Sequence, residues 1–177
     1  MRDELKRKVE TIFAEQAALA LQWGELQRER LRLRSAILDR FLHARDTVIV
    51  PAFQDFADCI RPHSWETEIE SIALTPEEYD DLPPWGNDPE TCLYFLRHDG
   101  APLSALPPLF RIGCHIHSGH IWYRQTQLYG LDDPLARHEG PTSPSELTVD
   151  FIQEKLVNFF KQLVLFEVRQ RLNWSYP

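Results

Sequence analysis

The stretch Leu109–Leu128, LFRIGCHIHSGHIWYRQTQL, decides the fold of this chain. Apolar and polar residues alternate on both sides of Ser118-Gly119, and a two-residue loop with glycine second is typical of a tight β-hairpin. This register pairs His117 with His120. Because successive side chains of a strand point to opposite faces, the hairpin has two different faces. The apolar face, which we expect in the core, contains Phe110, Ile112, Cys114, Ile116, Ile121 and Tyr123.

The segments around this hairpin complete an α+β fold. Two further strands are predicted before it, at residues 65–70, where apolar and acidic residues alternate, and at residues 91–98. A short helix is expected at residues 47–61, with a bend near residues 46–51 because Pro51 does not suit a helix interior. Ser143, Pro144 and Glu146 form a capping box that predicts a long helix over about residues 144–172. We therefore expect a long N-terminal helix, a short helix, a four-stranded antiparallel meander and a long C-terminal helix packed on the sheet.

The first 45 residues contain no proline and form a heptad pattern. One series at position d and a second series at position a repeat every seven residues over about five heptads, which is typical of a coiled coil. The seam contains Leu5, Val9, Ile12, Gln16, Leu19, Trp23, Leu26, Arg30, Leu33 and Ile37. We predict a helical stalk at residues 1–45, a single α+β domain at residues 46–177, and a homodimer formed through the stalk. The alternative is that the second half of this helix packs on the chain's own core.

Charge and composition restrict the possible partners and location. The formal net charge is −8, and residues 1–45 carry ten basic and seven acidic side chains. An acidic body argues against nucleic-acid binding, because phosphate contacts need a basic surface. Three cysteines without metal-ligand spacing indicate free thiols in a reducing compartment. The chain has no apolar run of about eighteen residues and a charged start, so we predict a cytoplasmic protein that does not enter a membrane.

The polar face of the hairpin holds the candidate functional residues, which are Arg111, His115, His117, His120, Trp122 and Arg124. Tryptophan and arginine are enriched at binding hot spots, so this face is a candidate partner-binding surface. The alternative is a metal site, because His115, His117 and His120 would converge across the turn. The string from His115 to His120 is similar to the HxHxDH motif of the metallo-β-lactamase superfamily. Gly119 stands at that motif's aspartate, so the chain is not assigned to this superfamily.

No motif in the sequence requires catalysis or a cofactor. It lacks GxSxG and glycine-rich phosphate loops, and Cys114 is expected in the core, where a thiol is inert. The layout of a coiled coil leading into a helix, meander and helix resembles that of some RWD-type adaptor domains, although the YPxxxP turn of that family is missing. We therefore expect a non-enzymatic interaction or scaffold protein with a protein partner of unknown identity. The alternative is a small metal- or ligand-binding protein that uses the histidine face.

Overall fold

The computed structural model describes residues 2–75, 78, 88–97, 107–125 and 138–174. It consists of α1 (Arg2–Ala44), the π-helical turn η1 (Arg45–Ile49), α2 (Val50–Ile60), the 3₁₀ turn η2 (Arg61–His63), β1 (Trp65–Ile72), β2 (Glu90–Arg97), β3 (Leu109–Cys114), β4 (Ile121–Gln125), β5 (His138–Glu139), the 3₁₀ turn η3 (Pro144–Glu146) and α3 (Val149–Trp174). The predicted α+β class is confirmed, as are the long helices at both ends of the chain. The sheet has five strands where four were predicted, because the short β5 lies in a segment read as a loop.

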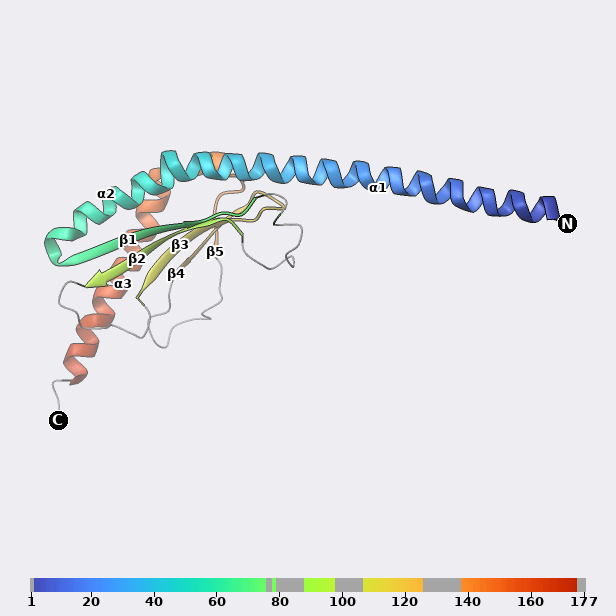
Figure 1. Ribbon diagram of the computed structural model, residues 1–177. Coiled ribbons are helices and arrows are strands. Elements are labelled where there is room, and N and C mark those ends of the chain that lie inside the picture. Colours follow the sequence, from blue (N-terminus) through green and yellow to red (C-terminus); the bar gives the residue numbers. More distant parts are fainter. Residues whose placement is uncertain (1, 76–77, 79–87, 98–106, 126–137, 175–177) are drawn as a thin grey trace.

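The five strands form an antiparallel meander in the order β1-β2-β3-β4-β5. Helices α2 and α3 cover one face of this sheet, and α1 projects far beyond it (Figure 1). Phenylalanines dominate the layer between the helices and the sheet. Phe95 of β2 lies 5.4 Å from Phe159 of α3 between ring centroids, and Phe53 of α2 meets Phe110 of β3 edge-on at 6.2 Å. Edge-to-face rings at such distances add to the stabilisation from burial.

The register of the central hairpin differs from the prediction. Cys114 pairs with Ile121, and the His115 amide donates to the His120 carbonyl at 2.9 Å, so the loop has four residues, 116–119. Gly119 adopts a positive φ of 78°, which glycine accepts without steric cost. The observed loop is two residues longer than the predicted one. Because side chains alternate between the two faces of a strand with a period of two, each strand residue keeps its predicted face. It releases Ile116 from the strand, and Ile116 is buried instead beside Leu38 of α1.

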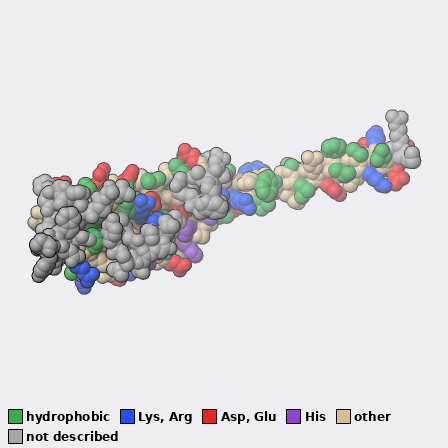
Figure 2. Space-filling view, turned by 90° about the horizontal axis from the view of Figure 1, so that it is seen from below, with side chains coloured by type: hydrophobic (Ala, Val, Ile, Leu, Met, Phe, Trp, Pro, Cys, Tyr) green, Lys and Arg blue, Asp and Glu red, His purple; other side chains and the backbone are tan. Residues whose placement is uncertain are grey.

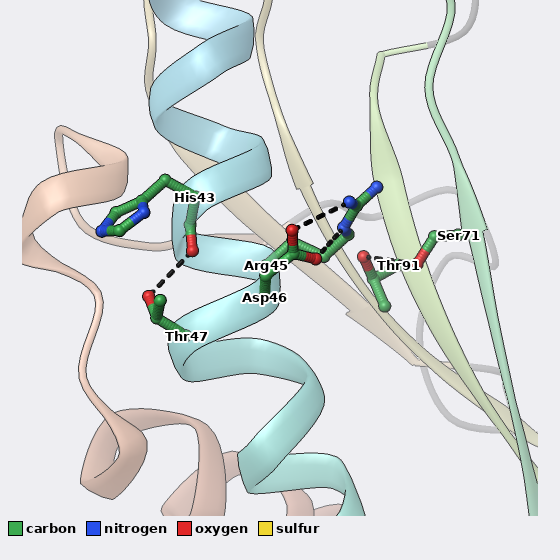
Figure 3. A network of polar contacts seen from close by, with 6 residues as sticks. All are labelled: His43, Arg45, Asp46, Thr47, Ser71 and Thr91. Atoms are coloured by element: carbon green, nitrogen blue, oxygen red, sulfur yellow. Dashed lines mark hydrogen bonds and ion pairs between the residues drawn. The ribbon is translucent and has the colours of Figure 1, made fainter.

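The joint between α1 and α2 confirms the bend expected near Pro51 (Figure 1). Pro51 has no amide hydrogen to continue the helical ladder, and the Val50 amide bonds instead to the Arg45 carbonyl, five residues back. The Thr47 hydroxyl donates to the His43 carbonyl at 2.8 Å, a contact that bends helices (Figure 3). Arg45 forms an ion pair with Asp46 at 2.7 Å, between Nε and Oδ1 (Figure 3).

The last part of α1 belongs to the body of the protein. Leu38, Phe41 and Ala44 are buried, whereas most side chains before residue 31 are exposed. These three residues lie before the predicted boundary at residue 45, and they pack with the α+β body. Within the described segments, α1 included, no helix is both long and apolar enough for a membrane span.

The C-terminal helix begins later than expected. Ser143 accepts a bond from the Ser145 amide, and Glu146 accepts one from the Thr142 amide at 3.2 Å, but these contacts cap the short turn η3. Helix α3 itself starts at Val149, where the Thr148 hydroxyl accepts from the Phe151 amide at 3.2 Å. The buried side of α3 presents Ile152, Leu156, Phe159 and Leu163 to the sheet.

Candidate functional site

The projecting part of α1 carries an exposed apolar stripe, which we call the α1 stripe (Figure 2). It consists of the predicted seam residues Leu5, Val9, Ile12, Leu19, Trp23, Leu26 and Leu33, each at least 42% exposed. Gln16 and Arg30, at the polar positions of the same seam, are also exposed. An amphipathic helix normally buries its apolar side, since isolated helices gain little stability in water without packing. In this structure the apolar side of α1 is left uncovered along the stripe.

The α1 stripe ends where the hairpin loop reaches the helix. A Cβ atom at Gly119 would lie 3.8 Å from the Ile37 side chain, and Ile37 occupies the last seam position. Ile116 is buried in a small cluster with Leu38. We call loop residues 116–119 the hairpin tip. It occupies the continuation of the seam, so Ile37 is half-buried by the chain's own body rather than left open.

The hairpin tip places His117 beside two arginines of α1. Partial burial lowers the pKa of His117, and the positive charge of Arg34 lowers it further, with a smaller contribution from Arg30. Histidine side chains gather at the end of the body from which α1 projects (Figure 2). His117 therefore belongs to the neck between α1 and the hairpin.

On the open face of the sheet, the face that α2 and α3 do not cover, Trp122 lies flat over Gly113. The two residues are cross-strand partners, and a Cβ added to Gly113 would come within 3.0 Å of three atoms of the indole ring. The ring nitrogen Nε1 donates to Asp88 Oδ2 at 3.1 Å. Trp122 is only 3% exposed, so it supplies almost no surface to a partner.

Asp88 is the polar centre of this region. Its Oδ2 also accepts from His115 Nδ1 at 2.8 Å, and its Oδ1 accepts from the Ile116 amide at 3.4 Å. The Asp88 side chain is 9% exposed and that of His115 is 43% exposed. A buried carboxylate with these three donors fixes the orientation of the imidazole through Nδ1 and leaves the second ring nitrogen, Nε2, outside this bond. Asp88 is thus a buried carboxylate that holds the β3–β4 hairpin and Trp122 in place.

A cavity of about 320 Å³ lies beside this pair, at the edge formed by β4 and β5. Its lining includes His115, His120, Trp122, His138 and Glu139. His138 also stacks on Tyr123 with ring centroids 5.0 Å apart. The mix of imidazoles, one carboxylate and an indole edge offers both donors and acceptors to a small polar ligand.

A second polar group lies further along the open face. Arg111 Nη1 forms an ion pair with Glu90 Oε1 at 3.1 Å, and the side chain of Glu90 is 13% exposed. Burial, and next to it the charge of Glu90, raises the pKa of the Cys92 thiol to about 12. The Tyr94 hydroxyl donates to Glu70 Oε2 at 2.7 Å, and this bond raises the pKa of Tyr94 to about 12. These groups are held protonated or paired, which is the condition of a structural network and not of a nucleophile.

The predicted partner-binding residues lie in different surroundings, with Arg124 opposite Arg111 on the neighbouring strand. His115 and His120 line the cavity, His117 lies at the neck beside α1, Arg111 is paired with Glu90, and Trp122 is buried. Within the described residues, no group of three or more histidine, cysteine, aspartate or glutamate side chains is arranged to hold a metal ion. The histidine triad therefore remains a prediction without a formed ligand set.

Four polar residues of this region were not predicted from sequence, namely Asp88, Glu90, His138 and Glu139. Gly113, a glycine inside a predicted strand, was the available signal, because strand glycines mark the close approach of another group. The acids and His138 carried no such signal, since they stand in polar segments that read as surface loops. Comparison with protein-family models, with curated proteins and with solved structures finds no match for this chain.

Proposed function

We propose that this protein is a non-enzymatic interaction or scaffold protein that forms a homodimer through α1 and presents its α+β head to a protein partner. The observation that carries the proposal is the α1 stripe, whose exposed side chains follow one heptad seam from Leu5 to Leu33. Covering an apolar side chain of this size stabilises an assembly by up to about 1.5–3 kcal/mol. The seam continues over about four heptads, which is long enough for a stable coiled coil.

The dimer is tested by a charge placed on the seam and the same charge placed beside it. Leu19, at position d, is 65% exposed, and Leu21, at the outward position f, is 70% exposed. We expect sedimentation equilibrium to give a dimer for the natural chain and for Leu21→Glu. Leu19→Glu should weaken dimerisation at least about 100-fold, because an unpaired buried carboxylate costs several kcal/mol. A monomeric natural chain at micromolar concentration, or equal behaviour of the two variants, would refute the proposal.

The head's contribution is tested at the exposed histidines. His117 and His120 are exposed on the hairpin, and His63 is exposed on the turn η2, away from the hairpin. A double variant His117→Ala/His120→Ala should lose a specific partner that both the natural chain and His63→Ala retain in cross-linking and capture. Retention of every captured partner by the double variant would remove the hairpin from the binding surface.

The cavity beside Asp88 supports a second candidate, a small ligand-binding protein that uses the histidine face. The fixed Asp88–His115 pair gives this cavity a preset hydrogen-bonding direction. Calorimetric titration with zinc and a thermal-shift screen of small polar compounds test the candidate, with His115→Ala and His120→Ala as variants that should lose binding. Absence of any saturable effect on the natural chain would eliminate this candidate and leave the scaffold proposal unaffected.

A further inference from the structure

We infer that the second copy of the chain lies parallel to the first, and that pairing ends at Leu33, where the hairpin tips of the two copies meet. This inference rests on the proposed dimer and adds its orientation and its boundary. The occupant of the α1 stripe is thus α1 of a second copy in the same direction. Three observations support the inference. The hairpin tip covers the end of the seam, charged residues flank the seam, and the seam itself contains two polar residues.

The hairpin tip sets the boundary. Gly119 lies against Ile37 and Ile116 against Leu38, so the chain's own tip occupies the seam just beyond Leu33. In an antiparallel coiled coil, each position a of one helix pairs with a position d of the other. An alignment that used all five a positions, from Val9 to Ile37, would place Leu5 of the partner opposite Ile37. That position is already filled by the tip. In a parallel pair, the two helices separate after Leu33 and no residue of the second α1 competes for this space.

Charges beside the seam also disfavour the full antiparallel alignment. In coiled coils, positions e and g flank the seam and set the orientation of the partner. The full antiparallel alignment brings Glu15 against Glu29 of the second copy, and Lys6 against Arg34 of the second copy. Like charges at such positions are destabilising. At the positions that flank the seam, the parallel alignment brings Glu29 against Arg34 of the second copy and Gln22 against Gln27 of the second copy, with no like-charged pair among them.

A second antiparallel alignment shifts the partner by one heptad relative to the full alignment. The polar residues of the seam disfavour it. It avoids the hairpin tip and the like-charge pairs, but it places Gln16 against Leu19 and Arg30 against Leu5 of the second copy. A buried polar group without a partner costs free energy. In the parallel pair, each Gln16 amide meets its equivalent and can form a hydrogen bond. Each Arg30 meets the equivalent Arg30 in the seam, and Glu29 of the second copy, at the adjacent position g, offsets the repulsion between the two guanidinium groups.

Distances between spin labels on the full chain test the orientation. The labels are placed at Asp3→Cys or at Ser118→Cys in a Cys59→Ser background, because Cys59 is exposed while Cys92 and Cys114 are buried. The parallel pair places equivalent Asp3→Cys labels at the same height along the axis, with helix axes about 8–10 Å apart. The shifted antiparallel pair separates them by about 44 Å and the Ser118→Cys labels by about 60 Å, at about 1.5 Å per residue.

Short distances at both positions support the inference. A short Asp3→Cys distance with a long Ser118→Cys distance overturns the meeting of the tips, and long distances at both positions overturn the parallel orientation, while the proposed dimer stands in each case. A monomeric mass with no dipolar coupling overturns the dimer itself. Adding Leu19→Glu to the Asp3→Cys chain is the control and should abolish the coupling, whereas adding Leu21→Glu should preserve it.

Discussion

Replacement of Gly113 by alanine tests whether the contact between Trp122 and the β3 backbone holds the open face together. The added methyl group would come within 3.0 Å of three indole atoms, so the ring must move. Such overpacking costs about 1–3 kcal/mol. The displaced ring also loses the 3.1 Å bond from Nε1 to the Asp88 carboxylate, and a hydrogen bond to a charged group contributes about 1.5–3 kcal/mol. We therefore expect the free energy of unfolding to fall by about 3–6 kcal/mol.

Urea denaturation followed by tryptophan fluorescence measures this loss, with all variants at one protein concentration because association shifts apparent stability. The matched control is Gly24→Ala, since Gly24 lies in α1 and a Cβ there would meet no atom within 4 Å. This control should gain about 0.5–1 kcal/mol from the better helix former. The double variant Gly113→Ala/Trp122→Leu should lose less than the sum of the two single changes, because the small side chain removes the clash. A Gly113→Ala chain as stable as the natural one, with unchanged fluorescence, would refute the reasoning.

Three further predictions concern single side chains. In the native chain, a thiol reagent should modify only Cys59, which is exposed. Burial raises the pKa values of the Cys92 and Cys114 thiols to about 12, so neither thiol should react. Labelling of a second thiol before unfolding would contradict this prediction. Burial lowers the pKa of His117 from 6.5, so the unfolded chain binds the proton more tightly and stability should decrease as the pH falls below about 6.5. His117→Gln should reduce this pH dependence of the denaturation midpoint, and an identical pH profile in the variant would argue against the assignment. Ile116→Ala should lower the free energy of unfolding by about 2–4 kcal/mol, because Ile116 is buried against α1. Ile72→Ala, at a residue 41% exposed on β1, should lower it much less. Equal losses in the two variants would show that the hairpin tip does not anchor α1.

Hydrophobic periodicity was sufficient to predict most of the fold. Trp65 and Ile69 alternate with glutamates in β1, and Leu5 to Leu33 repeat at heptad spacing in α1, so the period of each pattern indicates a strand in the first case and a helix in the second. Pro51 marked the joint for a local steric reason that does not depend on the rest of the chain. The same local reasoning failed at the hairpin. Ser118-Gly119 favours a two-residue turn, but the burial of Ile116 against Leu38 favours a four-residue loop, and that contact joins residues far apart in sequence.

The polar centre of the open face was the least predictable part. Asp88 follows a run of acidic and proline residues and reads as solvated, yet it accepts bonds from His115 and Trp122. Nothing in local composition marks Asp88 as the residue of this run that would be buried. Tertiary packing, which brings β3, β4 and residue 88 together, determines its burial. The predicted histidine cluster was divided for the same reason, since His115 bonds to Asp88 while His117 stays exposed in the hairpin tip.

The joint at η1 turns α1 into a lever. The helical path continues without interruption from α1 through η1 into α2, and buried residues on both sides of the joint, Phe41 and Ile49, fix it to the core. Measured from the joint, the 43 residues of α1 form an arm of about 65 Å, so a change of about 10° at the joint would move its free end by about 11 Å. Small adjustments among Arg45, Asp46 and Thr47 are thereby magnified at the far end. Conversely, any force applied to the tip of α1 is delivered to the helix layer beneath the sheet.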